Sequence, residues 1–190
     1  MPSISIRPAS TATDDGLRLL RNFDSQLPFL SSIGSSAQWG SSSRSDQEDQ
    51  RAKYRGKVES SERGWDHAWS RDWVRAYIAE VEIKREDLSS ELLELATDTS
   101  ESTTAAVRLP VAGMILQGQS ADYVRDIVPE NDDNDPFIYV LYLLSDRRTA
   151  PHGKGAGAAL ISHAKDEARK LGIRRLCLDC WRGNDNRLVQ

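Results

Sequence analysis

The sequence predicts an α/β fold, and three neighbouring segments carry this prediction. Residues 137–144 are almost wholly apolar, as expected for a central strand that is covered on both faces. Residues 158–171 repeat apolar side chains at helical spacing. Between them lies the glycine-rich stretch 152–157. A strand, a glycine-rich turn and a helix in this order place backbone N–H groups at a helix N-terminus.

The N-terminal third predicts one strand and two helices. Residues 3–7 alternate apolar and polar side chains and predict a strand that ends at Pro8. Residues 13–15 can cap a helix that follows them. Residues 27–45 are rich in Ser and Gly and predict a loop. Residues 46–63 have high helix propensity but few apolar side chains, which predicts an exposed or poorly ordered helix.

Three tryptophans follow at intervals of four residues, namely Trp65, Trp69 and Trp73. On a helix this spacing aligns them in one stripe, and we expect that stripe to pack in the core rather than to form a substrate cage. Residues 75–83 alternate in character and predict a second strand, with Glu80 on one of its faces.

Two polar stretches separate the remaining strands. Residues 84–108 contain a short helical piece at 88–95, and residues 119–135 are acidic. A strand is predicted between them at 110–117. We expect residues 1–190 to form a single domain in which these two stretches are insertions. The acidic stretch resembles a calcium loop only in composition, because the glycine and the glutamate of that motif are missing, so no metal site is expected there.

The cysteines do not predict a metal site either. Cys177 and Cys180 lie in a predicted strand at 174–181, where positions three apart face opposite sides. The three histidines are scattered along the chain, and no second cysteine pair completes a zinc site. We expect both cysteines to be buried or half-buried.

The composition narrows the class of protein. Twenty-five Lys and Arg against 29 Asp and Glu give a net charge of −4, which excludes a nucleic-acid-binding stripe and weakly favours a cationic substrate. No stretch is long and apolar enough to span a membrane, and the N-terminus has no secretory signal pattern. These features predict a cytoplasmic chain.

The glycine-rich turn predicts an anion site. Gly153, Gly155 and Gly157 stand at alternate positions, so their backbone N–H groups are open to close approach by a ligand. A helix N-terminus attracts anions, yet this first turn contains Lys154 and no acid. An ordinary strand-to-helix turn also favours glycine, but it does not explain the lysine. The turn therefore predicts a pyrophosphate site.

Two phosphate-binding motifs are excluded by their spacing. The nucleoside triphosphate loop ends in Gly-Lys-Ser/Thr, and no hydroxyl side chain follows Lys154. The dinucleotide fingerprint needs Gly-x-Gly-x-x-Gly, and here Gly157 comes one residue early. Its acidic partner is missing as well, because Asp179 lies inside a predicted strand rather than at its end.

The turn resembles the Arg/Gln-x-x-Gly-x-Gly/Ala signature of the GNAT superfamily of acyl-CoA-dependent N-acetyltransferases. The matching residues are His152-Gly153-Lys154-Gly155-Ala156-Gly157, followed by Ala158. The downstream helix, strand and turn fit the same family, so the resemblance spans residues 137–190. Before that, the sequence is only compatible with the family. The resemblance implies a mixed, mostly antiparallel central sheet flanked by helices.

The resemblance also implies acetyl-CoA as cosubstrate, without a metal. Its pyrophosphate would bind the turn from His152 to Ala158. Its amide arm would lie along the bulged end of the fourth strand and beside the turn after the fifth. The corresponding residues are Leu143, Leu144, Ser145 and Asn184.

Two departures from the family pattern stand out. His152 occupies a position where Arg or Gln is usual. The family continues with a helix and two more strands, and its proton-donating tyrosine would fall about seven or eight residues after Asn184, just past Gln190. We therefore expect a chain that is truncated at its C-terminus relative to the family. Glu80 is the candidate base for the acceptor amine, since the second strand lines the acceptor side in this family; a solvated strand glutamate is the alternative.

The implied activity is transfer of the acetyl group of acetyl-CoA to a primary amine of a small molecule or protein. One alternative is a non-catalytic CoA-binding or partner-binding module, which the missing C-terminal elements favour. A phosphate-binding domain of another family is a third possibility. An uncovered edge of the fifth strand also predicts a homodimer formed through that edge.

Overall fold

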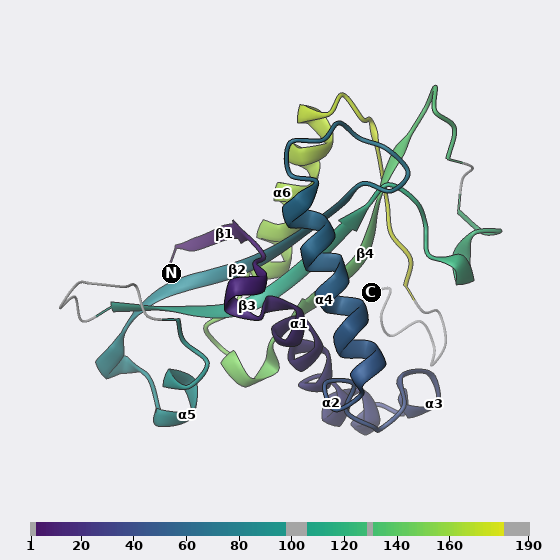
Figure 1. The fold of residues 1–190 in the computed structure, drawn as a ribbon. Helices are drawn as coiled ribbons and strands as arrows, with labels where there is room; N and C mark the ends of the chain where they lie inside the picture. The colour runs from purple at the N-terminus through teal and green to yellow at the C-terminus, as the bar shows by residue number, and fades with distance from the viewer. Residues whose placement is uncertain (1–2, 98–105, 129–130, 181–190) are drawn as a thin grey trace.

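The computed structural model describes residues 3–97, 106–128 and 131–180, and Figure 1 shows their arrangement. Five strands form one sheet in the order β1-β2-β3-β4-β5. They are β1 (Ile4–Pro8), β2 (Val74–Lys84), β3 (Ala106–Gln117), β4 (Phe137–Ser145) and β5 (Arg175–Cys177). Each pairing from β1 to β4 is antiparallel, and β4 pairs with β5 in parallel. The mixed, mostly antiparallel sheet is therefore confirmed.

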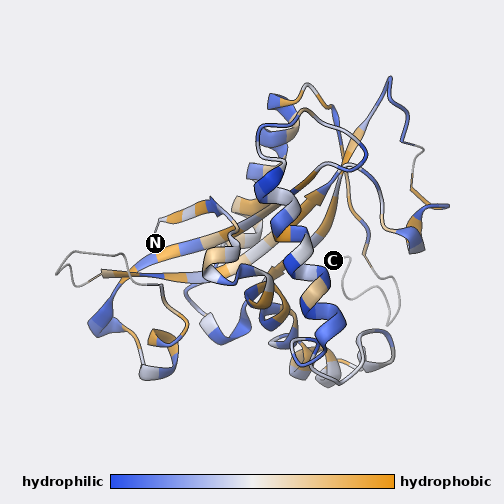
Figure 2. Ribbon diagram, in the orientation of Figure 1, coloured by the Kyte–Doolittle hydropathy of each residue, from blue (hydrophilic) through white to orange (hydrophobic). Residues whose placement is uncertain are grey.

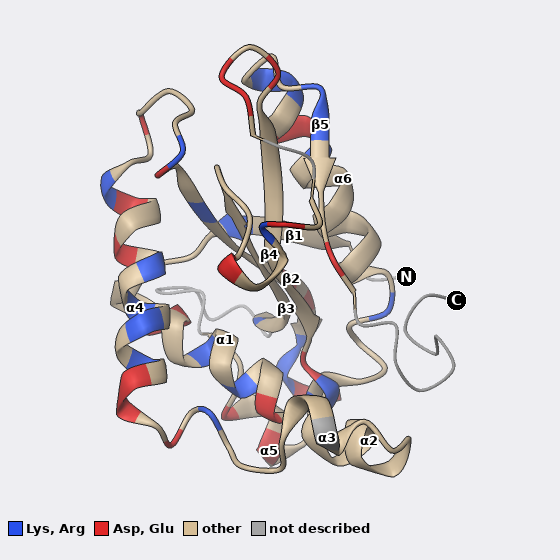
Figure 3. Ribbon diagram, turned by 90° about the vertical axis from the view of Figure 1, so that its right-hand side faces the viewer, with Lys and Arg blue, Asp and Glu red and all other residues tan. Residues whose placement is uncertain are grey.

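Helices cover both faces of this sheet. They are α1 (Asp15–Asp24), α2 (Leu27–Ser32), α3 (Ser36–Trp39), α4 (Glu48–Arg63), α5 (Ser90–Leu93) and α6 (Ala156–Lys170). Short 3₁₀ turns occur at η1 (Thr11–Thr13), η2 (Arg85–Asp87), η3 (Asp122–Val124) and η4 (Arg147–Thr149). Figure 3 shows three layers, with α1 and α4 on one side of the strands and α6 on the other. No helix in the described ranges is long and apolar enough to cross a membrane.

The alternation of β2 builds a core on each face of the sheet. Tyr77, Ala79 and Val81 pack on the α6 side, where Ala156 and Leu160 are fully buried. The other face buries a second cluster that includes Ala76, Ile78, Leu19, Phe23 and Val58. Figure 2 shows apolar residues along the sheet and polar residues along much of α4. The predicted exposed helix at 46–63 is thus confirmed as α4, in which only Val58 and Ser61 are buried.

The predicted loop at 27–45 is wrong at Leu27–Ser32 and Ser36–Trp39, where α2 and α3 form. Leu27 and Leu30 lie one helical turn apart, and both are buried. Pro28 stands in the first turn of α2, where its missing N–H costs nothing. Burial of two leucines therefore outweighs the loop-like composition.

The predicted helical stripe of tryptophans is also wrong. α4 ends at Arg63, and the chain reaches β2 through turns and irregular structure. Trp73 is 4% exposed in the core, whereas Trp65 is 40% exposed. The guanidinium of Arg75 lies over both rings, 5.0 Å from the centroid of Trp65 and 4.8 Å from that of Trp73. Core packing thus holds for Trp73, and Trp69 packs against the same cluster, but the three side chains share no helix face.

The fifth strand is shorter than the sequence pattern predicts. β5 pairs with β4 over three residues and ends at Cys177, which is half-buried. Cys180 lies beyond the strand and is exposed, so the expectation that both cysteines are covered is wrong for Cys180. The alternation of apolar residues continues after Cys177, but the described chain offers it no strand to pair with.

Candidate functional site

The end of β4 is held in place by α1 and by the loop that follows. Gln26, just after α1, donates its Nε2 hydrogen to the carbonyl oxygen of Ser145 at 2.5 Å. The buried carboxylate of Asp146 caps η4 by accepting the N–H of Arg148 at 3.0 Å. Thr149 is fully buried, and its Oγ1 donates to the carbonyl of Asp146 at 2.8 Å. These bonds fix the route of the chain from β4 to the glycine-rich turn.

The turn itself requires glycine at Gly155. This residue is the N-cap of α6 and has φ of +91°, a left-handed conformation that other residues adopt only at a cost. Ala156 follows it and is fully buried, which anchors the start of α6 in the core. A Cβ added at Gly157 would meet no described atom within 4 Å. Gly155 thus has a conformational role, whereas Gly157 leaves open space in front of the helix.

Several backbone N–H groups at the start of α6 are unpaired. The N–H of Ala156 donates to Gly153 and that of Ala159 to Gly155, both at 3.0 Å. Those of Gly155, Gly157 and Ala158 have no partner among the described residues. The first turn of α6 contains no acid. Free N–H groups at the positive end of a 15-residue helix are suited to binding an anion.

One edge of β4 is open beside the turn. The pairing with β5 stops at Tyr139 and Cys177. The pairing with β3 shifts there too, because Leu116 faces Val140 while Ile115 faces Tyr142, which leaves Leu141 as a bulge. The bulge lies ahead of Leu143, where the expected arm-binding segment begins. In the described chain, residues 140–145 therefore have no strand on their β5 side.

A cavity of about 520 Å³ lies against this edge. Its walls come from α1, α3, α4, β4 and the segment after β5, and they include Leu141, Leu143 and Leu144. A volume of this size is typical of small-molecule sites. The charged side chains on its wall are Arg44, Lys53, Lys57 and Asp179.

Asp179 is the carboxylate on the described wall of this cavity. It accepts a hydrogen bond from the hydroxyl of Tyr139. Burial raises the pKa of Tyr139, and the bond to Asp179 raises it further. The tyrosine is therefore a protonated donor at neutral pH, and it fixes the orientation of the carboxylate. The sequence pattern did not indicate Asp179, because its position depends on where β4 and β5 part.

Glu80 stands in a different environment. Its side chain is 2% exposed, and its Oε1 accepts a hydrogen bond from Nε of Arg7 at 2.7 Å. It does not line the cavity beside β4. Residues 143–145 thus lead along the chain to the glycine-rich turn, whereas Glu80 lies in a buried ion pair with Arg7. Its role as a base stays a prediction, and Asn184 lies outside the described residues.

No protein-family model and no curated protein matches the sequence. Solved structures do match the fold. The PaiA N-acetyltransferase from Thermoplasma acidophilum, in complex with coenzyme A, has a TM-score of 0.53 at 15% identity over 96% of this chain and 82% of its own. A possible acetyltransferase from Clostridium difficile 630 has a TM-score of 0.50 at 15% identity, over 96% and 83%. The chain has the N-acetyltransferase fold.

The GNAT-like fold that the glycine-rich turn implied is thus confirmed. In this N-acetyltransferase fold the turn from His152 to Ala158 and the open edge of β4 follow one another along the chain, as the resemblance implied. The cavity wall on α4 was not anticipated. Lys53 and Lys57 lie on a helix whose sequence indicated only solvent exposure, so the pattern gave no reason to single them out.

Proposed function

We propose that the protein is an acetyl-CoA-dependent N-acetyltransferase that acts on a primary amine. One observation carries this proposal. The free N–H groups of Gly155, Gly157 and Ala158 follow, after η4, a strand whose open edge borders a small-molecule cavity. An anion site at the turn and an unpaired strand edge suit a ligand with a diphosphate at one end and an amide-containing arm.

Binding and positioning account for much of the proposed chemistry. The diphosphate of acetyl-CoA would bind the turn, and its arm would take hydrogen bonds from the free edge of residues 140–145. An edge N–H near the bulge at Leu141 would then donate to the thioester oxygen as negative charge develops there. Holding the thioester beside an amine can lower the barrier by several kcal/mol.

We further propose Asp179 as the group that takes the proton of the amine, directly or through water. Its position on the cavity wall and its bond from Tyr139 support this role. The amine loses a proton as nitrogen attacks the thioester carbon. The C–S bond then breaks, and the departing thiolate takes a proton from solvent or from a group on the protein.

Replacing Asp179 with asparagine is expected to lower kcat about a hundredfold, because general base catalysis typically contributes that much or more. Thiol release at saturating amine and acetyl-CoA measures kcat. Asp166→Asn, an exposed change on α6, is the control. A folded Glu80→Gln variant with kcat lowered about a hundredfold, beside an Asp179→Asn variant that keeps the wild-type kcat, would assign the base to Glu80 instead.

The proposed function is tested by binding and then by turnover. Acetyl-CoA should raise the melting temperature of the protein, whereas ATP and NAD at the same concentration should not. A panel of primary amines should then release free thiol from acetyl-CoA. Stabilisation by acetyl-CoA without thiol release from any amine would indicate a CoA-binding module. Equal stabilisation by ATP or NAD would indicate another phosphate-binding function.

A further inference from the structure

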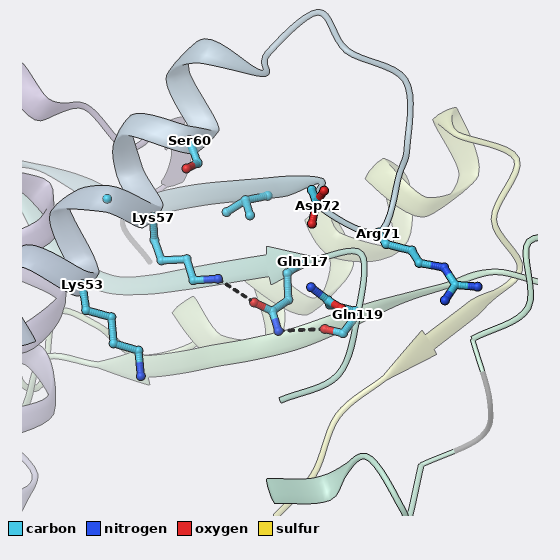
Figure 4. Close-up of a pocket in the computed structure, with 9 residues that line it drawn as sticks. Lys53, Lys57, Ser60, Arg71, Asp72, Gln117 and Gln119 are labelled. Atoms are coloured by element: carbon cyan, nitrogen blue, oxygen red, sulfur yellow. Dashed lines mark hydrogen bonds between the residues drawn. The ribbon is translucent and has the colours of Figure 1, made fainter. Parts of the chain in front are cut away.

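Two lysines on α4 form a wall shared by two neighbouring cavities. Lys53 and Lys57 are one helical turn apart and therefore project from the same face of α4. Both line the cavity beside β4, and both also line a second cavity of about 320 Å³ at the ends of β2 and β3. Figure 4 shows the two side chains reaching from α4 toward the end of β3.

Lys57 is held in position by neutral partners. Its Nζ donates to Oε1 of Gln117 at 2.9 Å. Gln117 is 6% exposed, and its Nε2 donates to the carbonyl of Gln119 at 2.7 Å (Figure 4). Burial lowers the pKa of Lys57, and the charge of Lys53 lowers it further. The amide chain thus orients the ammonium group without neutralising it.

The described cations that line the cavity beside β4 have no carboxylate partners. In the described part of the chain, Arg44, Lys53 and Lys57 form no ion pair within 4.0 Å. The carboxylate of Asp179 on the same cavity accepts from Tyr139, and Asp72 on the second cavity is exposed. On a chain with a net charge of −4, this wall is a local excess of positive charge.

We infer that the acceptor amine also carries an anionic group, a carboxylate or a phosphate, that binds between Lys53 and Lys57. The inference rests on the proposed function. Ammonium groups oriented on a cavity wall give charge-assisted hydrogen bonds to such a group, which are about twice as strong as neutral ones. With the anion held at α4, the amine points across the cavity toward Asp179 and the edge of β4. The net negative charge of the whole chain weakly favours a cationic amine, but the charge on this cavity wall is positive and favours an anionic group.

Matched amines test the inference. β-Alanine is compared with ethylamine, which lacks only the carboxylate. Phosphoethanolamine is compared with ethanolamine, which lacks only the phosphate. We expect kcat/KM to be at least about tenfold higher for the anionic member of a pair. The first comparison tests recognition of a carboxylate, and the second tests recognition of a phosphate. An equal or higher kcat/KM for the members without an anionic group, or for a diamine such as putrescine, would overturn the inference. It would leave the proposed function intact.

Lysine variants locate the effect. Lys57→Gln and Lys53→Gln should each lower kcat/KM for the anionic amine about tenfold to a hundredfold. For the amine without an anionic group, the same variants should leave kcat/KM unchanged. They should also leave the KM of acetyl-CoA unchanged. Lys165→Gln, an exposed change on α6, is the matched control. A rise in the KM of acetyl-CoA would assign the lysines to the cosubstrate and refute the inference. No thiol release from any amine would refute the proposed function and the inference together.

Discussion

Replacing Asp15 with alanine is expected to lower the free energy of unfolding by about 3–5 kcal/mol, because it breaks a largely buried ion pair with Arg7 and removes the acceptor of several buried hydrogen bonds. The Asp15 side chain is completely buried. It accepts hydrogen bonds from Arg7 at 2.5 Å, from the N–H of Ser10 at 2.8 Å, from Thr13 at 2.9 Å and from Arg18 at 3.1 Å. Urea unfolding measures the loss.

The control for this prediction is Asp126→Ala, which removes an exposed carboxylate and should change stability by about 0.5 kcal/mol or less. The second partner of Arg7 is Glu80, so the guanidinium joins β1, α1 and β2 in one cluster. An Asp15→Ala variant as stable as the Asp126→Ala variant would show that Glu80 alone compensates the charge of Arg7.

The same cluster predicts how stability depends on pH. Burial alone would raise the pKa of Asp15, but hydrogen bonds from Arg7, Ser10 and Thr13 and the charge of Arg7 outweigh it and lower the pKa. A group whose pKa is lower in the folded state contributes fully above its unfolded pKa of about 3.9 and loses that contribution as the pH falls through the folded value. An Asp15→Asn variant should therefore lose less stability than the wild type below about pH 4.

Replacing Gly157 with phenylalanine is expected to weaken acetyl-CoA binding by at least about a hundredfold, which corresponds to about 2.7 kcal/mol. A Cβ at this position meets no described atom within 4 Å, so the new side chain enters the space in front of the free N–H groups. The fold should not suffer, because glycine is the poorest non-proline helix former. Titration calorimetry measures affinity, and the melting temperature of the unliganded variant checks the fold.

Ser162→Phe is the matched control for Gly157→Phe, since it adds the same ring to an exposed position further along α6. It should bind acetyl-CoA like the wild type. Gly155→Ala is a less direct test, because its left-handed φ makes any side chain there strain the turn. A folded Gly157→Phe protein with unchanged affinity would place the diphosphate elsewhere and contradict the proposed cosubstrate site.

The sequence predicted those parts of the fold in which a local residue pattern is enough to identify a strand or a turn. β2 and β4 both lie inside the sheet and are mostly apolar, and successive residues of β2 pack alternately into the clusters on its two faces. The glycine-rich turn was predictable because both its φ angle and its open N–H groups need glycine. α2 escaped prediction because two buried leucines are a weak signal among serines.

The parts of the site that depend on contacts between distant segments could not be predicted. The bulge at Leu141 follows from the register with β3, which no local pattern encodes. The bond of Glu80 to Arg7 joins residues 73 positions apart. Lys53 and Lys57 lie on a mostly polar helix, and only the packing of α4 against α1 and β2 turns these two side chains toward a cavity (Figure 4).

The parting of β4 from β5 has a consequence for cohesion of the molecule. After Tyr139, no described strand pairs with the outward edge of β4. An amide-bearing ligand lying along this edge would take the place of a neighbouring strand. Binding of the proposed cosubstrate would then also stabilise the sheet at this edge, and its release would expose the edge of β4 again.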